Sequence, residues 1–326
     1  MNTAWLNTRM WLCVVLLFAV VYTLFVVIGT FMGIGTPLIF SLGALALVSL
    51  QFFIGPKIVE WTMRVRYVSE GEEPELHKMV SELAMKAGIP KPRIGISKIP
   101  IPNAFAFGTS KKTGRICVTG RLMELLNRDE LEAVLAHELS HIKHRDVTVI
   151  TALSVIPMIC YFIYFSFFWS GIFGGRGGGD SKEGGVPMMA IAIIAFVLYF
   201  VSNLIVLYAS RVREYYADAG AVELTKKPHA LASALYKIIY GSARLNTGKI
   251  KKEMGSMRAF FAADPMTAAG DLRDLRAADR NKDSQIDEYE LKEFAERARV
   301  RRTERVMELF STHPNPVSRV KKLGKY

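Results

Sequence analysis

The sequence predicts an integral membrane protein with four helical spans and a cytoplasmic mixed α+β domain, which is mainly helical with a small antiparallel sheet. Three features lead to this prediction: four long apolar runs, lysines and arginines near the ends of those runs, and a His-Glu-Leu-Ser-His sequence at residues 137–141. With 51% hydrophobic residues and a positive mean hydropathy, the 326-residue chain is neither an ordinary soluble domain nor a disordered one.

The apolar runs are each close to the length of about 20 residues that a helix needs to cross a bilayer. They cover residues 11–32, 37–55, 147–171 and 187–209. The first run is too long for the core of a signal peptide, so we expect it to be retained. Polar residues within the last run leave a buried core helix as the alternative for the third and fourth runs, but their length and lack of charge favour spans.

Basic residues set the expected orientation, because lysine and arginine beside a span favour the cytoplasmic side. They follow the second run, precede the third and follow the fourth: Lys57, Arg64, Arg66, Lys143, Arg145, Arg211 and Arg213. We therefore expect a multi-pass protein of the cell membrane with both termini in the cytoplasm. The predicted parts are a membrane hairpin (1–56), the first part of the polar domain (57–146), a second hairpin with a Gly-rich outer loop (147–210) and the second part of the polar domain (211–326).

A helix is predicted around the two histidines of the 137–141 sequence. Asn127 and Glu130 are spaced as an N-cap and its capping-box partner, and neither glycine nor proline interrupts residues 128–146. Side chains four residues apart share one face of a helix, so His137 and His141 can grip one Zn²⁺, with Glu138 placed to act on water. The alternative is a surface helix with two ordinary histidines.

A catalytic zinc generally has three protein ligands, and the third must come from elsewhere in the chain. His144 is excluded because seven residues of helix place it about 10 Å along the axis from His137. The best candidate is Glu214, with Asp218 one turn later on a helix that continues from the fourth apolar run. A membrane hairpin of runs three and four would bring Glu214 to the histidines; the alternative is a charged helix surface.

These segments resemble the HtpX-type membrane metallopeptidases, a gluzincin family that also includes the prenyl-protein endopeptidases. The resemblance lies in residues 128–141 (RDELEAVLAHELSH), the following hairpin and residues 213–219 (REYYADA). It extends to Asn-Ala-Phe at 103–105 and His-Pro at 313–314. Asn315 departs from the family's frequent His-Pro-Pro, which bears on the details of that loop.

The resemblance implies a gluzincin-type metallopeptidase domain that binds one zinc ion per subunit, and it implies residue roles. The zinc ligands would be His137, His141 and Glu214, the catalytic base Glu138, and the hydrogen-bond partner of a ligand histidine Asp218. His313 would stabilise the oxyanion formed when water attacks a peptide carbonyl. The alternative for His313 is a turn residue ahead of two prolines.

Three short strands are expected before the zinc helix, after a helix at residues 74–88. They are Arg93–Ile96, Ala104–Gly108 and Arg115–Thr119, with a turn at Lys111–Gly114. Peptidases commonly bind substrate as an added strand, and the candidate edge that contacts it is Asn103, Ala104 and Phe105. A plain structural hairpin is the alternative.

An insertion around residues 268–300 contains oxygen donors with the spacing of an EF-hand loop. The donors for Ca²⁺ or Mg²⁺ would be Asp279, Asn281, Asp283, Gln285 through its carbonyl, Asp287 and Glu290. Ser284 occupies the position that normally requires glycine. The competing interpretation is that Asp287 caps the next helix, with Glu290 as its capping-box partner.

Charge and cysteine content narrow the function classes. The net charge of +12 is largely accounted for by basic residues beside the spans, which favour anionic lipid headgroups, and we expect no nucleic-acid partner. The three cysteines form no Cys-x-x-Cys pair and predict no disulfide framework. The expected partners are the lipid bilayer and unfolded or membrane protein substrates; the sequence gives no oligomeric state.

The expected function is that of a zinc-dependent endopeptidase acting near the membrane surface. Resemblance implies quality control of misfolded or damaged membrane proteins. The alternatives are a prenyl-protein processing peptidase, disfavoured by only four spans, and a non-catalytic metal-binding scaffold or sensor, disfavoured because a structural zinc site has no use for Glu138. A transporter or receptor is less consistent with spans that contain no ionisable residue.

Overall fold

The structure is a computed structural model that describes residues 12, 16, 19, 53–173, 185–244, 268–299 and 307–326. The first two predicted spans, 11–32 and 37–55, lie almost entirely outside these residues. The chain forms two compact units. One consists mainly of residues 54–148 and 210–326, and the second contains residues 149–209.

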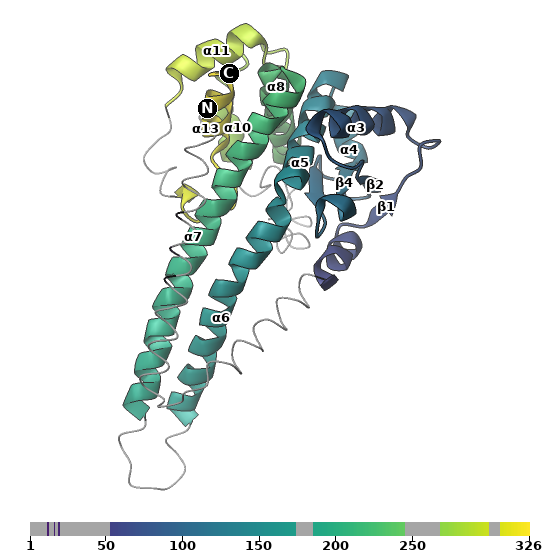
Figure 1. Ribbon diagram of the computed structural model, residues 1–326. Coiled ribbons are helices and arrows are strands. Elements are labelled where there is room, and N and C mark those ends of the chain that lie inside the picture. Colours follow the sequence, from purple (N-terminus) through teal and green to yellow (C-terminus); the bar gives the residue numbers. More distant parts are fainter. Residues whose placement is uncertain are drawn as a thin grey trace. The chain divides into compact units, whose positions relative to one another are not determined.

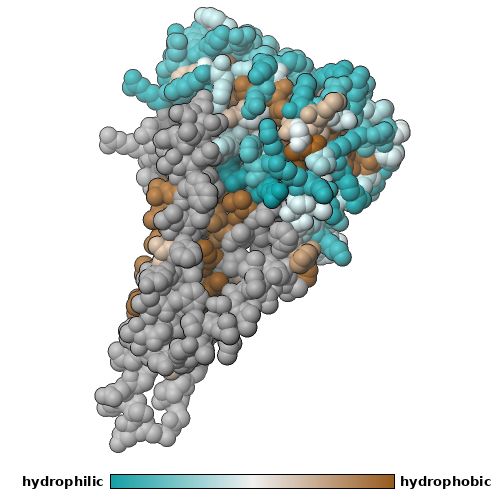
Figure 2. All heavy atoms as spheres, viewed as in Figure 1, coloured by the Kyte–Doolittle hydropathy of each residue, from teal (hydrophilic) through white to brown (hydrophobic). Residues whose placement is uncertain are grey.

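The second unit contains two long apolar helices that pack side by side, α6 (Asp146–Phe173) and α7 (Gly185–Thr225) (Figure 1). Between them lie small or branched side chains such as Cys160, Ile163 and Ala195. Large apolar side chains are exposed along both helices: Tyr161, Phe162, Phe165, Trp169, Ile193, Phe196 and Phe200. Figure 2 shows brown, hydrophobic residues along the described part of this hairpin, beside the grey atoms. This arrangement is typical of helices that face lipid.

Among the described residues, one helix is long and apolar enough to cross a membrane, at Met188–Thr225. Only 28% of its most apolar stretch is buried within the structure, which distinguishes it from the core helix of a soluble protein. The described apolar part of α6, Ile156–Trp169, is shorter.

The first unit contains a four-stranded sheet with the order β1-β2-β4-β3. The strands are β1 (Val65–Tyr67), β2 (Arg93–Ser97), β3 (Ala104–Phe107) and β4 (Arg115–Thr119). β1 pairs antiparallel with β2 and β3 antiparallel with β4, whereas β2 and β4 run parallel.

The prediction of an antiparallel sheet was therefore wrong, because the sheet is mixed. β4 is apolar and buried at Ile116, Cys117 and Val118, so it takes an interior position between β2 and β3. β3 is displaced to the edge, which leaves β2 and β4 as parallel neighbours. The expected turn at 111–114 is a short 3₁₀ helix, Lys111–Thr113, and β1 was not predicted.

Helices pack around this sheet, and the zinc helix α5 (Arg128–His144) lies at their centre, in contact with α3, α8 and β3. The others are α3 (Pro74–Ala87), α4 (Gly120–Leu125), α8 (Pro228–Ala243), α10 (Ala268–Leu275), α11 (Glu288–Arg297) and α13 (Pro316–Leu323). The predicted capping box is confirmed, since Asn127 accepts from Glu130 N–H and Glu130 accepts from Asn127 N–H. Leu135 and Leu139 are fully buried, which fixes the rotation of α5 about its axis.

The C-terminal part of α7 approaches α5 closely at Gly220. A Cβ atom at Gly220 would lie 2.2 Å from Oγ and 3.0 Å from Cβ of Ser140. The absent side chain lets the two helices that carry His137, His141 and Glu214 meet.

Gly220→Ala should therefore destabilise the protein, by about 1–3 kcal/mol, because overpacking forces the helices apart. Gly270→Ala is the matched control: Gly270 lies in α10, nothing lies within 4 Å of the added Cβ, and helix propensity favours alanine by about 0.5–1 kcal/mol. The measurement is the free energy of unfolding of both variants in detergent. Equal stability of the two variants would contradict the close approach.

Candidate zinc site

Three ligand atoms converge in the first unit, from His137, His141 and Glu214, all within 4.8 Å of one another. The two Nε2 atoms are 3.2 Å apart. The carboxylate of Glu214 lies 3.6 Å from Nε2 of His137 and 3.5 Å from Nε2 of His141. Two imidazole nitrogens and one carboxylate oxygen are the donor set of a catalytic zinc with one position left open.

An aspartate lies at the other nitrogen of each imidazole ring. Nδ1 of His137 is 3.0 Å from Oδ1 of Asp218, and Nδ1 of His141 is 2.7 Å from Oδ2 of Asp146. At His141, an Nδ1 that donates to the carboxylate leaves the Nε2 lone pair free for a metal. At His137 the contact with Asp218 is an ion-pair distance without the geometry of a hydrogen bond. Two lone pairs and a carboxylate facing one another repel unless a cation lies between them, so the residues present fit zinc.

Each of these aspartates is paired with a buried arginine. Arg319 of α13 donates to both oxygens of Asp218, through Nε at 3.0 Å and Nη2 at 2.6 Å. Its Nη1 also lies 3.2 Å from Oε2 of Glu214. On the other side, Arg213 pairs with Asp146 and donates to the carbonyl of the last zinc-helix residue. The arginines offset the negative charge gathered beside the histidines and fix the carboxylates in place.

The charges keep both α7 carboxylates ionised. Burial alone would raise the pKa of Glu214, but the electrostatic interaction with His313, together with the contacts from His137 and Arg319, lowers that pKa well below its ordinary value. For Asp218, burial is again opposed, mainly by Arg319, and the pKa is lowered. An anionic Glu214 is the form that binds a dication.

His313 reaches the same cluster from the C-terminal segment. Its Nδ1 is 3.6 Å from Oε2 of Glu214, and both ring nitrogens are buried without a well-formed hydrogen bond to any described residue. Arg211 holds the preceding segment by donating to the carbonyls of Leu309 and Ser311.

Asn315, the departure from His-Pro-Pro, has a local structural explanation. It is the N-cap of α13, and its Oδ1 accepts from the N–H groups of Val317 and Ser318, with Pro316 in the first turn. Asn315 therefore begins the helix that contains Arg319.

The predicted edge strand lies where it was expected. β3 is at the edge of the sheet, and Asn103 just before it is fully buried, with its backbone paired to Thr119. Ala104 and Phe105 are buried as well.

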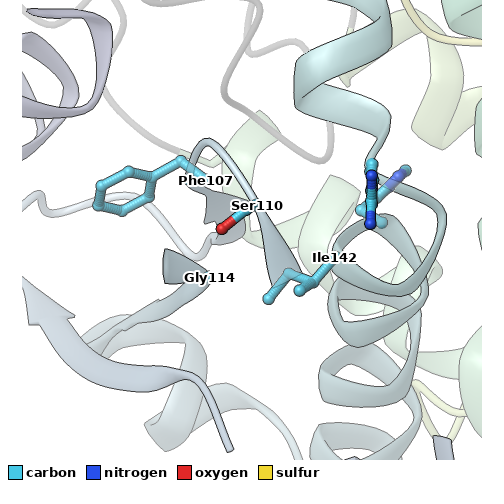
Figure 3. Close-up of a pocket in the computed structure, with 7 residues that line it drawn as sticks. Phe107, Ser110, Gly114 and Ile142 are labelled. Carbon is cyan, nitrogen blue, oxygen red and sulfur yellow. The ribbon is translucent and has the colours of Figure 1, made fainter. Parts of the chain in front are cut away.

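A small pocket lies beside the ligand His141, between the turn that joins β3 to β4 and the last turn of α5. Figure 3 shows Ile142 of α5 facing Ser110 and Gly114 of that turn. Seven residues line the pocket: Phe107, Gly108, Ser110, Gly114, His141, Ile142 and Arg145.

The sequence patterns did not single out Asp146 or Arg319, and they indicated Arg213 only as a basic residue beside the fourth span. The only local signal for Asp146 was an acidic residue directly after the zinc helix. For Arg319 it was an arginine on the apolar side of a short amphipathic helix, where charge is rare unless paired.

The chain matches peptidase family M48 over residues 70–326. It belongs to that family. A curated relative, "Protease HtpX homolog" of Methanothermobacter thermautotrophicus, is 49% identical over 76% of this chain and 92% of its own length. "Protease HtpX homolog 2" of Methanosarcina mazei is 35% identical over 95% of this chain and 91% of its own length.

Among solved structures, the S. mikatae Ste24p crystal structure matches this M48 peptidase with a TM-score of 0.54. The match covers 97% of this chain and 67% of that one at 16% identity, which shows a shared fold alone. With the donor set at His137, His141 and Glu214, these findings confirm the expectation of an HtpX-type zinc metallopeptidase, and the non-catalytic scaffold is set aside.

Proposed function

We propose that this M48 peptidase is a multi-pass, membrane-bound endopeptidase that hydrolyses peptide bonds of misfolded or damaged membrane and cytoplasmic proteins at the cytoplasmic membrane surface. The observation that best supports it is a single helix, α7, which contains both the apolar stretch and the third ligand, Glu214. The reaction is thereby tied to a membrane-spanning element. The first two spans and the cytoplasmic orientation rest on the sequence pattern and the positive-inside rule.

The chemistry follows from the residues around the ligands. Zinc bound by His137, His141 and Glu214, one ion per subunit, supplies Lewis acidity that polarises a carbonyl and lowers the pKa of water. Glu138, buried and adjacent to His137 on α5, takes the proton of the attacking water and later returns it to the leaving amine. His313 donates a ring N–H to the oxyanion. Asp218 holds the ring of His137 in the required tautomer.

Substrate is held by backbone contacts that do not depend on side-chain identity. In this proposal an extended peptide pairs with the edge strand β3 next to Asn103, Ala104 and Phe105. Recognition of this kind requires an unfolded segment, which supports damaged or misfolded proteins as the substrate class.

The test uses membrane vesicles that contain the full-length protein and a reduced, alkylated soluble protein as the unfolded substrate. Inverted vesicles, whose cytoplasmic face is outward, should cleave it about tenfold or more faster than the same protein in its folded form, because folded chains expose strands only on opening. Right-side-out vesicles should not cleave it, and Glu138→Gln vesicles are the inactive control. Cleavage of the unfolded protein by right-side-out vesicles would overturn the proposal. So would a result in which inverted vesicles cleave a prenylated peptide but not the unfolded protein.

A further inference from the structure

The 279–290 loop connects two helices of the first unit and is anchored at both ends by apolar side chains. Leu272 and Leu275 of α10 and Leu291 of α11 are buried, and Ile286 within the loop is 1% exposed. The segment is thus a helix–loop–helix element packed against α8 and α13.

α8 braces the loop in its middle. The N–H of Ile286 donates to Oγ of Ser233 at 3.2 Å. Ser233 Oγ in turn donates to Oε1 of Glu130 at 2.7 Å, and Glu130 caps the zinc helix. An isolated EF-hand-like loop is expected to lack such a brace, and here one is supplied by a neighbouring helix.

The backbone of the loop has the turn that calcium loops require. Ser284, the sixth residue, has φ of 67°, in the left-handed region where a calcium loop normally has glycine. Its N–H donates to Oδ2 of Asp279 at 3.1 Å. The carboxylate of the first loop residue therefore points across the loop.

Asp279 supplies the observation that points to a ligand. It is 6% exposed and lies beside the hydroxyl of Tyr236 on α8, but among the described residues no hydrogen bond of good geometry reaches its buried Oδ1. Burying a carboxylate oxygen without a donor is costly. A cation inside the loop would remove that cost.

The chemistry of the donor atoms determines which cation the loop can bind. The six candidate ligands are oxygens, without imidazole or thiolate, which excludes a zinc-type site. A flexible loop that supplies six protein oxygens fits Ca²⁺ better than Mg²⁺, which requires a strict octahedron and usually keeps several of its waters.

Glu290 has two tasks in this arrangement. The capping box predicted with Asp287 is present, and Oε1 of Glu290 also accepts from the N–H groups of Arg280 and Asn281 at 2.8 and 3.2 Å. The carboxylate thus already lies over the first residues of the loop. Oε1 uses both of its lone pairs in these two bonds, whereas Oε2 accepts one N–H, from Asp287, and keeps a lone pair for a cation, so capping is compatible with coordination through Oε2.

We propose that residues 279–290 bind one Ca²⁺ ion, at a second metal site distinct from the zinc ligands. Ser284 in place of glycine weakens the site, with an expected dissociation constant of about 10⁻⁴–10⁻³ M. The ion stabilises the α10–α11 element, which the Ser233 and Glu130 hydrogen bonds connect to the zinc helix.

The test is calorimetric titration of CaCl₂ into the full-length, zinc-loaded protein in detergent. The wild type should show saturable heat for one site. Asp283→Asn should weaken binding by about tenfold or more, because it removes a ligand charge at an exposed position. Asparagine can still accept from the N–H of Gln285, and the exposed bond from Nδ2 of Asn281 is lost. Ser284→Gly should tighten binding, because glycine adopts the positive φ without strain.

Glu296→Gln is the matched control, since it removes the same charge from an exposed position of α11 outside the loop. It should bind like the wild type. No saturable heat at millimolar CaCl₂ in both the wild type and Ser284→Gly would overturn the proposal. So would unchanged binding in Asp283→Asn, or MgCl₂ binding as tightly as CaCl₂.

Discussion

Replacing Glu138 with glutamine should lower kcat/KM for an unfolded protein substrate by about 10²–10⁴-fold, while the zinc content stays at one ion per subunit. Glutamine keeps the size of the side chain but cannot accept the proton of the attacking water. The zinc content should be retained because Glu138 is not among the three converging ligand residues. The measurements are initial cleavage rates and zinc content on the same purified samples.

Glu132→Gln is the control for this variant, since Glu132 lies earlier on the same helix and its contact is a long ion pair with Lys227. Its activity should match the wild type. A Glu138→Gln enzyme that retains wild-type activity would remove Glu138 as the base. Simultaneous loss of zinc would indicate that Glu138 acts through metal binding instead.

Replacing Glu214 with alanine should weaken zinc binding by more than the roughly 10–100-fold typical of residues that only orient a ligand. The substitution removes an anionic donor and leaves Arg319, with the ring of His313, facing the histidines without their carboxylate. Competition with a zinc chelator on the full-length protein measures the affinity, and cleavage activity should fall with zinc occupancy.

The matched control for Glu214→Ala is Glu223→Ala, an exposed position further along α7. Glu223→Ala removes a negative charge from the same helix without removing a zinc ligand. Its zinc affinity should therefore equal that of the wild type. Unchanged zinc affinity in Glu214→Ala would require a different third ligand.

Local sequence patterns predicted most residues of the zinc site. The four-residue spacing of His137 and His141 and the Asn127–Glu130 capping box are properties of one helix, so they can be read from the chain. Glu214 was predicted from its place on the helix after the fourth apolar run and from the membrane hairpin, the resemblance implied the same role, and the structure brings it to the histidines.

The remaining parts depend on tertiary packing. Arg319 pairs with Asp218 across 101 residues of sequence, and no local pattern specifies such a contact. The parallel pairing of β2 and β4 likewise follows from which strand is buried on both faces, not from strand order along the chain. Asp146 is adjacent to the zinc helix, but its role becomes visible only when its carboxylate meets Nδ1 of His141.

The most direct test of the zinc site is an anomalous-scattering map recorded at the zinc absorption edge from crystals of the full-length protein. The account predicts one peak per subunit, about 2 Å from Nε2 of His137, Nε2 of His141 and a carboxylate oxygen of Glu214. A peak elsewhere, or one coordinated by the histidines without Glu214, would contradict it.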